Sequence, residues 1–536
     1  MKRLLYNIFY SFPIQLFILH FRKFQVLLVF WYILGSTINS HFMKTYGADA
    51  LFLSPEYLGN VNAFSAAIVG VALGVFVMSW NVTTFILHSK RCKFLATTGN
   101  PFLKYCLNNA LLPLCFLVFY FSRIYPFDAQ KELMSTGEIL WVMGGILGGL
   151  IFTLLISFIF FFGAARTIQR TLTPMIAASH HLEPVAPQGA AGQAAAYGMR
   201  VSYFLSTRFR FRKVRNVAHY SQNFLDLVFK RHHISGILSI ALAFSFLVVV
   251  GFFMDYPLLQ VPAAASIFIF FAVMTAVIGS LTYLLQSWSL LFVILFLLGI
   301  DFLYQREIID PRNKAYGLNY INKEERPGYD KASLQQLCTP RKIEADRANM
   351  LTVLSNWKKK QGTDKPVMVL INVSGGGLRS ATFVMNTLQQ LDSITQGRIM
   401  KQTFLISGAS GGMLSATYFR ELYRRNLDAT QRINLHNPQL TDSIAADLLN
   451  PMFSSMIARD LFAPAQKFRV GEFSYVKDRG YAFEQKLLQN SGGILNQQLK
   501  DYYGDEQAAR IPLMIFNSTI TRDGKILGFV GRRHPD

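Results

Sequence analysis

The feature that most constrains this chain is a succession of apolar stretches in its first 305 residues, each long enough to cross a lipid bilayer. A membrane-spanning helix needs about 20 mostly apolar residues, because the hydrocarbon core is roughly 30 Å thick and a helix rises about 1.5 Å per residue. One such stretch could be a buried helix of a soluble protein, but a long succession predicts a helical membrane region. We expect about seven spanning helices, with a range of six to eight, at 24–42, 62–87, 108–125, 139–165, 235–254, 259–281 and 285–304, and an interfacial helix or further span at 5–20.

The chain is strongly basic, with 53 Lys and Arg against 31 Asp and Glu and a formal net charge of +22. Basic loops beside apolar spans are typical of the cytoplasmic side of a membrane, so anionic lipid headgroups explain this charge better than nucleic acid does. The basic loops at 88–107 and 166–234 are predicted to face the cytoplasm, and basic residues after the last span favour the same side for the C-terminal domain. Residues 208–215 alternate basic and apolar side chains, which predicts a helix or strand at the headgroup surface.

The hydropathy of the chain falls at about residue 305, and this change suggests a division into domains. We predict a multi-pass membrane region at 1–305, a connecting segment at 306–365 with a helix at 340–360, and an α/β domain at 366–536. The four cysteines form no Cys-x-x-Cys pair and no cluster with histidine, so neither a disulfide framework nor a metal site is predicted.

Two glycine motifs follow short apolar runs in the C-terminal domain. The run at 367–373 is almost continuously apolar, as in a parallel strand that is buried on both faces, and it leads into Ser374-Gly375-Gly376-Gly377-Leu378-Arg379-Ser380 and an amphipathic helix. A glycine loop between a strand and a helix lets backbone N–H groups converge on an anion. This loop lacks the Gly-Lys-Ser/Thr ending of a P-loop and the spacing of the dinucleotide fingerprint, so no nucleotide cofactor is predicted.

The second motif points to a nucleophile. The apolar run at 403–407 enters Gly408-Ala409-Ser410-Gly411-Gly412, and an amphipathic helix is predicted to follow from Met413 to Arg424. Gly-x-Ser-x-Gly between a strand and a helix is the setting of a nucleophile elbow, in which small neighbours allow strand, helix and substrate to approach a strained serine. The sequence therefore predicts that Ser410 is a catalytic nucleophile.

The order Gly-Gly-Gly-x-Arg, then Gly-x-Ser-Gly-Gly, resembles the patatin-like phospholipase family over residues 365–530. The resemblance implies a three-layer α/β hydrolase domain with a mostly parallel sheet, following an α-helical membrane bundle. Ser374 and Ser380 stand where the family often has Asp and Gly, but neither change removes a backbone donor. Carried over by position, the oxyanion-hole donors are Gly375, Gly376, Gly377 and Gly411, and the structural residues of the two motifs are Arg379, which would brace the glycine loop, Gly408 and Gly412.

The resemblance also implies a Ser–Asp dyad, whose aspartate lies in an Asp-Gly-Gly or Asp-Gly-Ala motif downstream of the serine. This chain contains neither motif after Ser410, and its late Asp-Gly is Asp523-Gly524. Asp-Gly between two apolar runs is a strong signal for a β-hairpin, so we interpret Asp523 as a turn residue and keep its role as general base as the alternative. We therefore expect the hydrolase domain to be incomplete at its C-terminus.

The function expected from these features is hydrolysis of membrane lipid acyl esters through an acyl-enzyme on Ser410, by an integral membrane protein without a cofactor. Two alternatives stay open. An acyltransferase would use the same acyl-enzyme and pass the chain to an alcohol, and a membrane protein could carry a vestigial, inactive hydrolase domain. The sequence holds no motif for the lipid headgroup, the acyl chain or the oligomeric state.

Overall fold

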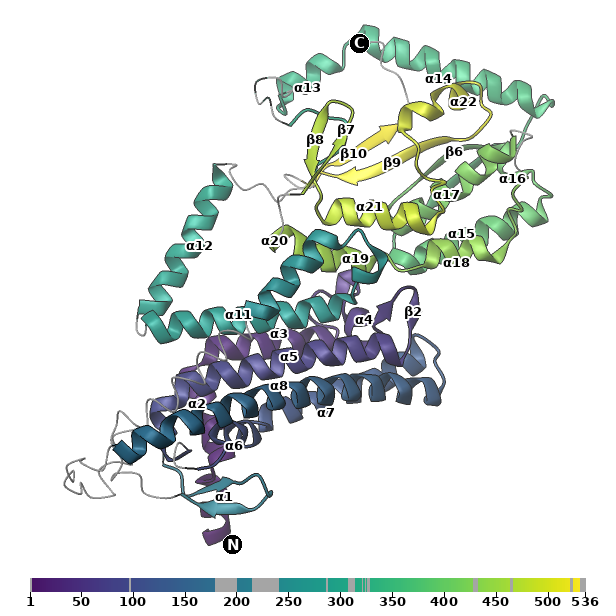
Figure 1. Cartoon of the computed structure of the whole chain (residues 1–536). Helices are drawn as coiled ribbons and strands as arrows, with labels where there is room; N and C mark the ends of the chain where they lie inside the picture. The colour runs from purple at the N-terminus through teal and green to yellow at the C-terminus, as the bar shows by residue number, and fades with distance from the viewer. Residues whose placement is uncertain are drawn as a thin grey trace. The chain divides into compact units, whose positions relative to one another are not determined.

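The computed structural model of the chain is drawn in Figure 1. It describes residues 2–95, 98–178, 200–214, 241–285, 288–306, 314–320, 322, 324, 328–427, 432–462, 466–520 and 524–530. The chain folds into two compact units that interleave along the sequence. The first unit comprises Met1–Asn313, Leu449–Gln466 and Val476–Arg479, and the second comprises Lys314–Leu448, Lys467–Tyr475 and Gly480–Asp536.

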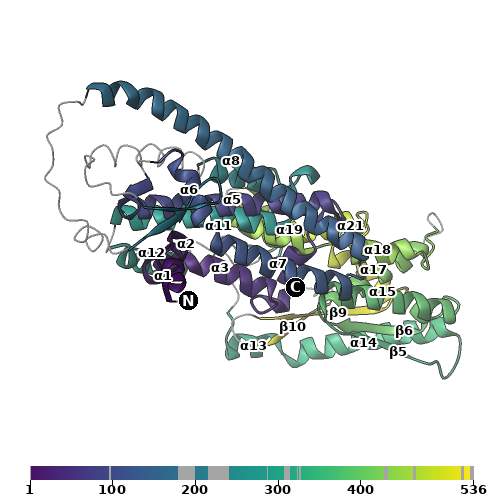
Figure 2. The ribbon, with the colours of Figure 1, turned by 90° about the horizontal axis from the view of Figure 1, so that it is seen from below.

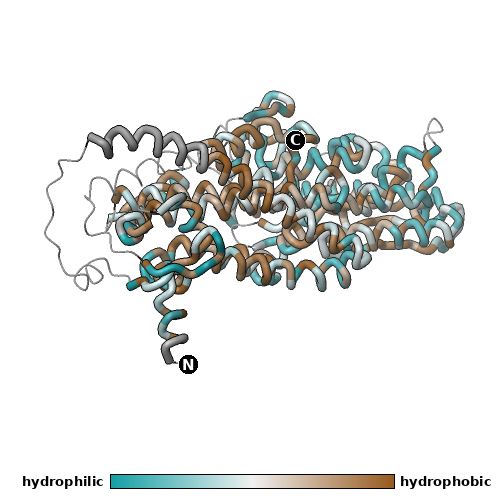
Figure 3. Tube along the Cα trace, turned by 60° about the horizontal axis from the view of Figure 1, so that its bottom comes forward, coloured by the Kyte–Doolittle hydropathy of each residue, from teal (hydrophilic) through white to brown (hydrophobic). Residues whose placement is uncertain are grey.

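The first unit is built from apolar helices, which Figure 3 shows as largely hydrophobic along their length. Its small elements include η1 (Lys44–Tyr46), η2 (Ser89–Arg91), η3 (Lys93–Leu95), β1 (Glu56–Tyr57) and β2 (Asn60–Val61). Its helices are α1 (Lys2–Phe9), α2 (Phe12–Lys23), α3 (Gln25–Ile38), α4 (Ala48–Leu53), α5 (Ala63–His88), α6 (Pro101–Asn108), α7 (Leu111–Gln130), α8 (Thr136–Ala178), α11 (Ala263–Leu285) and α12 (Ser289–Gln305).

A helical region suited to a membrane is present, but with fewer long helices than the sequence predicts. The described residues hold four helices that are long and apolar enough to cross a membrane, namely α5, α7, the part of α8 from Thr136 to Phe160, and α11. The count becomes five if α2 and α3, which meet at a bend of 99°, form one broken span. The predicted spans at 235–254 and 285–304 overlap the shorter apolar helices Ala241–Phe253 and Leu291–Gln305, and residues 235–240 and 286–287 of these spans lie outside the described residues.

Helices α5 and α8 pack closely because glycines recur at four-residue spacing on both of them. A Cβ atom on Gly70 would lie 2.1 Å from the Ile146 carbonyl oxygen, and one on Gly149 would lie 2.1 Å from the Ala67 carbonyl oxygen. A Cβ atom on Gly145, four residues before Gly149, would lie 2.2 Å from the Ala63 carbonyl oxygen, and one on Gly74, four residues after Gly70, would lie 2.6 Å from the Thr153 side chain. In lipid, the hydrophobic effect does not drive helices together, so association depends on packing contacts. Small residues let the two helix backbones approach closely and make these dispersion contacts.

We expect Gly149→Ala to destabilise the first unit by roughly 1–3 kcal/mol, because the added methyl group overpacks a backbone contact. Gly148→Ala is the matched control, since a Cβ atom there meets nothing within 4 Å and alanine favours a helix. The thermal unfolding midpoint of each variant in detergent measures the difference. Equal midpoints for the two variants would show that α5 and α8 do not pack as described.

A segment from the C-terminal half of the chain belongs to the first unit. It contains α19 (Leu449–Ser454), a π-helical turn (Ser455–Arg459) and α20 (Asp460–Phe462). Phe453 is buried in the same hydrophobic cluster as α11, and Asn450 caps α11 by accepting a hydrogen bond from Ala263 N at 2.8 Å. The buried Arg459 donates to Asp255 at 2.9 Å. The predicted order of domains does not include this insertion.

The second unit contains a four-stranded sheet in the order β10-β9-β6-β5. Strands β5 (Val369–Val373), β6 (Thr403–Gly408) and β9 (Leu513–Thr519) are parallel, and β10 (Ile526–Val530) pairs antiparallel with β9. Figures 1 and 2 show the sheet between α14 on one side and α15 and α17 on the other. The helices of this unit are α13 (Lys331–Leu337), α14 (Pro340–Gln361), α15 (Gly377–Ile394), α16 (Ile399–Gln402), α17 (Ser410–Leu427), α18 (Pro438–Ala445), α21 (Arg479–Asn490) and α22 (Tyr503–Gln507), and β7 (Lys467–Val470) and β8 (Phe473–Val476) form a separate hairpin.

Strand β5 differs from the prediction that it is buried on both faces. It is the last strand of the described sheet, and the side chains of Leu370 and Asn372 are exposed, the first by 63%. Ile371 and Val373 pack against the core of the unit. An apolar run alone cannot distinguish a central strand from an edge strand, because that depends on which other segments pair with it.

Candidate active site

The segment around Ser410 has the backbone geometry of a nucleophile elbow. Strand β6 ends at Gly408, α17 begins at Ser410, and Ser410 has a φ of +53°, in the left-handed region that a non-glycine residue rarely adopts. Such a conformation costs about 1–3 kcal/mol and persists only where the surrounding structure determines it. Here Ala409 N donates to Val373 O at 3.1 Å, which ties the turn to the neighbouring strand.

Glycines make this turn possible by letting backbone atoms come close. A Cβ atom on Gly408 would lie 2.1 Å from the Val373 carbonyl oxygen. One on Gly411 would lie 2.0 Å from the Gly377 carbonyl oxygen, and one on Gly412 would lie 2.5 Å from that of Ser374. No larger residue fits at these positions unless the backbone moves, which gives a physical reason for the predicted structural glycines.

The glycine loop from Gly375 to Gly377 lies directly against the elbow. A Cβ atom on Gly375 would be 3.1 Å from the Cβ atom of Ser410, although the two residues are far apart in the sequence. Gly376 and Gly377 have φ values of +156° and +63°. Ser380 Oγ donates to Ser374 O at 2.6 Å and so closes the loop at its end. The fold therefore brings together the two motifs that the sequence singles out.

Two helix N-termini meet at Ser410. It is the first residue of the 18-residue α17, and the 18-residue α15 begins at Gly377, where the N-cap Gly376 supplies no side-chain cap. The uncapped N–H groups and the aligned peptide dipoles at such ends favour negative charge. Ser410 and residues 374–377 are exposed, so a substrate can reach them. The arrangement can stabilise an oxyanion that forms next to the serine hydroxyl.

Arg379 and Asp523, which the sequence analysis considers as supporting residues, are not seen in contact with Ser410 or the glycine loop among the described residues. Arg379 is exposed on α15 and forms no hydrogen bond or ion pair with a described residue, so it is Ser380 that closes the glycine loop. The Ser410 hydroxyl likewise has no hydrogen-bond partner among the described residues. Strands β9 and β10 pair as the predicted hairpin requires, but Asp523 itself lies outside the described residues.

Asn517 on β9 is a site residue that the sequence analysis missed. Its Nδ2 donates to Gly408 O at 2.9 Å and to Ser407 Oγ at 3.1 Å, which fixes the end of β6 just before the elbow. The sequence pattern that could indicate Asn517 is weak, because it is only a single amide residue after the apolar run 511–516. We interpret Asn517 as a positioning residue for the elbow.

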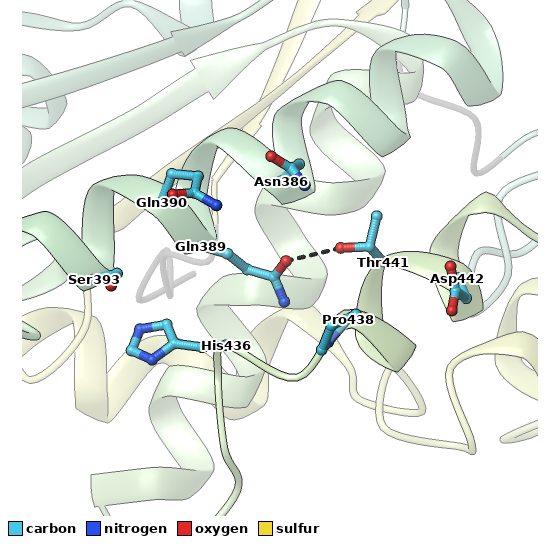
Figure 4. A pocket seen from close by; sticks show the side chains of 8 residues that line it. All are labelled: Asn386, Gln389, Gln390, Ser393, His436, Pro438, Thr441 and Asp442. Atoms are coloured by element: carbon cyan, nitrogen blue, oxygen red, sulfur yellow. Dashed lines mark hydrogen bonds between the residues drawn. The ribbon is translucent and has the colours of Figure 1, made fainter.

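A polar pocket of about 290 Å³ lies elsewhere in the second unit (Figure 4). Gln389 crosses it and accepts a hydrogen bond from Thr441 Oγ1 at 2.8 Å, while its amide nitrogen donates to Leu435 O and Asn437 O. Of the pocket residues on α15, Asn386 lies nearest to the Ser410 site. It follows Gly377 by nine positions, which is about 13 Å along the helix axis. The pocket is therefore separate from the Ser410 site, and Gln389 within it joins α15 to the start of α18.

The first unit contains a buried polar network that the sequence did not reveal. Asn109 Nδ2 donates to Asn81 Oδ1 at 2.9 Å and to Thr84 Oγ1 at 3.2 Å. Its Oδ1 atom must therefore accept from His20 Nε2, which lies 2.7 Å away. The ring of His88 packs 5.1 Å from that of His20. The network ties α2, α5 and the end of α6 together, and its members are too far apart in the sequence for spacing to indicate it.

Comparison of the chain with models of known protein families, with curated proteins and with solved structures finds no match. Among the described residues, no group of three or more His, Cys, Asp or Glu side chains could hold a metal ion. The assignment of a function therefore depends on the Ser410 site itself.

Proposed function

We propose that this chain is a membrane-bound serine hydrolase of lipid acyl esters, with Ser410 as the nucleophile. The observation that carries the proposal is the left-handed Ser410 between β6 and α17, with the Gly375–Gly377 loop against it. The resemblance of the two glycine motifs to the patatin-like phospholipase family supports an α/β hydrolase domain and a lipid substrate. The apolar helices of the same chain support a substrate drawn from the membrane.

The proposed reaction begins with attack of Ser410 Oγ on the ester carbonyl carbon. The hydroxyl proton passes to a general base, a role for which the sequence offers Asp523 only as the alternative to its interpretation as a turn residue, and the carbonyl oxygen becomes an oxyanion. Backbone N–H groups of the Gly375–Gly377 loop and of Gly411 would donate to this oxyanion, helped by the N-termini of α15 and α17. The alcohol then leaves with a proton, and water attacks the acyl-enzyme to release the fatty acid and regenerate Ser410.

Labelling by a fluorophosphonate probe tests the nucleophile, because this probe bonds covalently to an activated serine. We expect the wild-type protein in detergent to be labelled and Ser410→Ala to lose the label completely. Ser393→Ala is the matched control, since Ser393 is an equally exposed serine of α15 in the same unit, and this variant should keep the label. Labelling that survives Ser410→Ala would contradict the proposal, as would a folded wild-type protein that takes no label.

Release of fatty acid from phosphatidylcholine vesicles then tests the reaction. Removing the nucleophile of a serine hydrolase lowers kcat by up to about 10⁶-fold, so Ser410→Ala should show only the background rate. Adding glycerol as an acceptor distinguishes hydrolysis from acyl transfer. A product that is mainly acylglycerol rather than free fatty acid would assign the chain as an acyltransferase that uses the same nucleophile.

A further inference from the structure

A β-hairpin of the first unit is held firmly against its helices. Strands β3 (Tyr203–Leu205) and β4 (Phe211–Lys213) pair antiparallel. The side chain of Asn108 at the end of α6 makes two hydrogen bonds of 2.8 Å with the backbone N–H and C=O of Leu205. Ser202 N donates to Tyr10 O at 2.9 Å, and Phe204 is buried 5.8 Å from the ring of Phe94. The hairpin is thus a fixed surface of the unit.

Basic and aromatic side chains alternate at the tip and along β4 of this hairpin, and all of them are exposed. Phe209 at the tip is 74% exposed and Phe211 is 61% exposed. Exposed aromatic rings between cations are unfavourable in water, but they suit the boundary between headgroups and acyl chains. The exposed series consists of Arg208, Phe209, Arg210, Phe211, Arg212 and Lys213, and we call it the basic hairpin face.

Lys104 of α6 adds a further cation next to this face. Its Nζ donates to Gly99 O at 2.6 Å. Asn108, one turn after Lys104, holds the backbone of Leu205, and the neighbouring Phe204 pairs with Arg212 across the hairpin, which places Lys104 and Arg212 near each other. Burial and repulsion from Arg212 lower the pKa of Lys104. No Asp or Glu occurs in residues 57–127 or 184–225, and no described acidic residue forms an ion pair with Lys104 or Arg212. Like charges that are held together without a carboxylate are stabilised by a bound anion.

We propose that Lys104 and the basic hairpin face bind the phosphate of anionic phospholipid headgroups, while Phe209 and Phe211 enter the headgroup boundary. The alternating sequence at 208–215 predicts only a basic segment near headgroups. The structure adds Lys104 of α6 to these cations and shows that the hairpin is hydrogen-bonded to α6. The partner is lipid rather than nucleic acid because the exposed phenylalanines lie in the same unit as the apolar helices. This proposal is independent of the Ser410 chemistry.

Lipid binding to the full chain in mild detergent tests the proposal. We would titrate phosphatidylglycerol and phosphatidylcholine separately and follow bound lipid by native mass spectrometry. Each cation near an anionic headgroup contributes about a factor of five in affinity, so Lys104→Ala with Arg212→Ala should weaken phosphatidylglycerol binding about thirtyfold and leave phosphatidylcholine binding unchanged. Arg341→Ala with Lys342→Ala is the matched control, because both residues are exposed cations of the second unit.

A second double variant that preserves both charges tests the proposal even if the alanine variant folds poorly. Lys104→Arg with Arg212→Lys should retain most of the phosphatidylglycerol affinity. Equal phosphatidylglycerol affinity in the alanine variant and the control would overturn the proposal. Tighter binding of an RNA oligonucleotide than of phosphatidylglycerol at this face would overturn the choice of lipid, and equal binding of inorganic phosphate would show that the lipid chain and the phenylalanines play no part.

Discussion

Gly411→Ala is expected to lower the esterase rate about 10²–10³-fold while the protein stays folded. The added Cβ atom would lie 2.0 Å from the carbonyl oxygen of Gly377 and 2.7 Å from its carbonyl carbon. The glycine loop must therefore move away from the elbow. Losing one oxyanion-hole donor costs about 3–4 kcal/mol of transition-state stabilisation, which corresponds to this loss of rate.

The measurement is kcat/KM for fatty acid release, with the thermal unfolding midpoint recorded on the same sample. Gly504→Ala is the matched control, since a Cβ atom on this helical glycine of the second unit meets nothing within 4 Å. It should keep the wild-type rate. A folded Gly411→Ala variant with an unchanged rate would show that the contact between elbow and loop is not part of an oxyanion hole.

Much of the Ser410 site could be predicted from the sequence because its elements are local. The apolar runs at 367–373 and 403–407 lie at β5 and β6, and the helix predicted at 340–360 lies at α14. The Gly-x-Ser-x-Gly spacing indicates a strained turn because only small residues tolerate such close backbone approach, and Ser410 has that conformation. Adjacency of the two motifs follows from the parallel pairing of β5 with β6, which aligns Val373 with Gly408.

The features that could not be predicted depend on contacts between distant segments. The exposure of Leu370 depends on which segments pack over that face of the sheet, and the support from Asn517 depends on β9 lying beside β6. Insertion of the segment from Leu449 to Gln466 into the first unit depends on contacts such as Asn450 with Ala263, nearly two hundred residues apart. Hydropathy and motif spacing describe single segments, so neither contains this information.

Arg420→Met is expected to destabilise the second unit by about 3–5 kcal/mol, because it removes one member of a buried ion pair. Arg420 lies on α17, the helix that begins at Ser410, and its side chain is only 1% exposed. It donates to Glu506 on α22, whose side chain is 4% exposed, and also to Pro512 O at 3.0 Å. The guanidinium group stacks 4.5 Å from the ring centre of Tyr502. These contacts join α17 to the segment that leads into β9.

The control and the double variant separate the ion pair from general packing. Arg347→Met removes the pair with Glu344, whose side chains are 72% and 71% exposed, and should cost no more than about 1 kcal/mol. Arg420→Met combined with Glu506→Leu should recover most of the stability, because an apolar pair of similar volume can replace a buried ion pair. Unfolding midpoints in urea measure all three variants. A double variant less stable than Arg420→Met would mean that α17 is held mainly by contacts other than this pair.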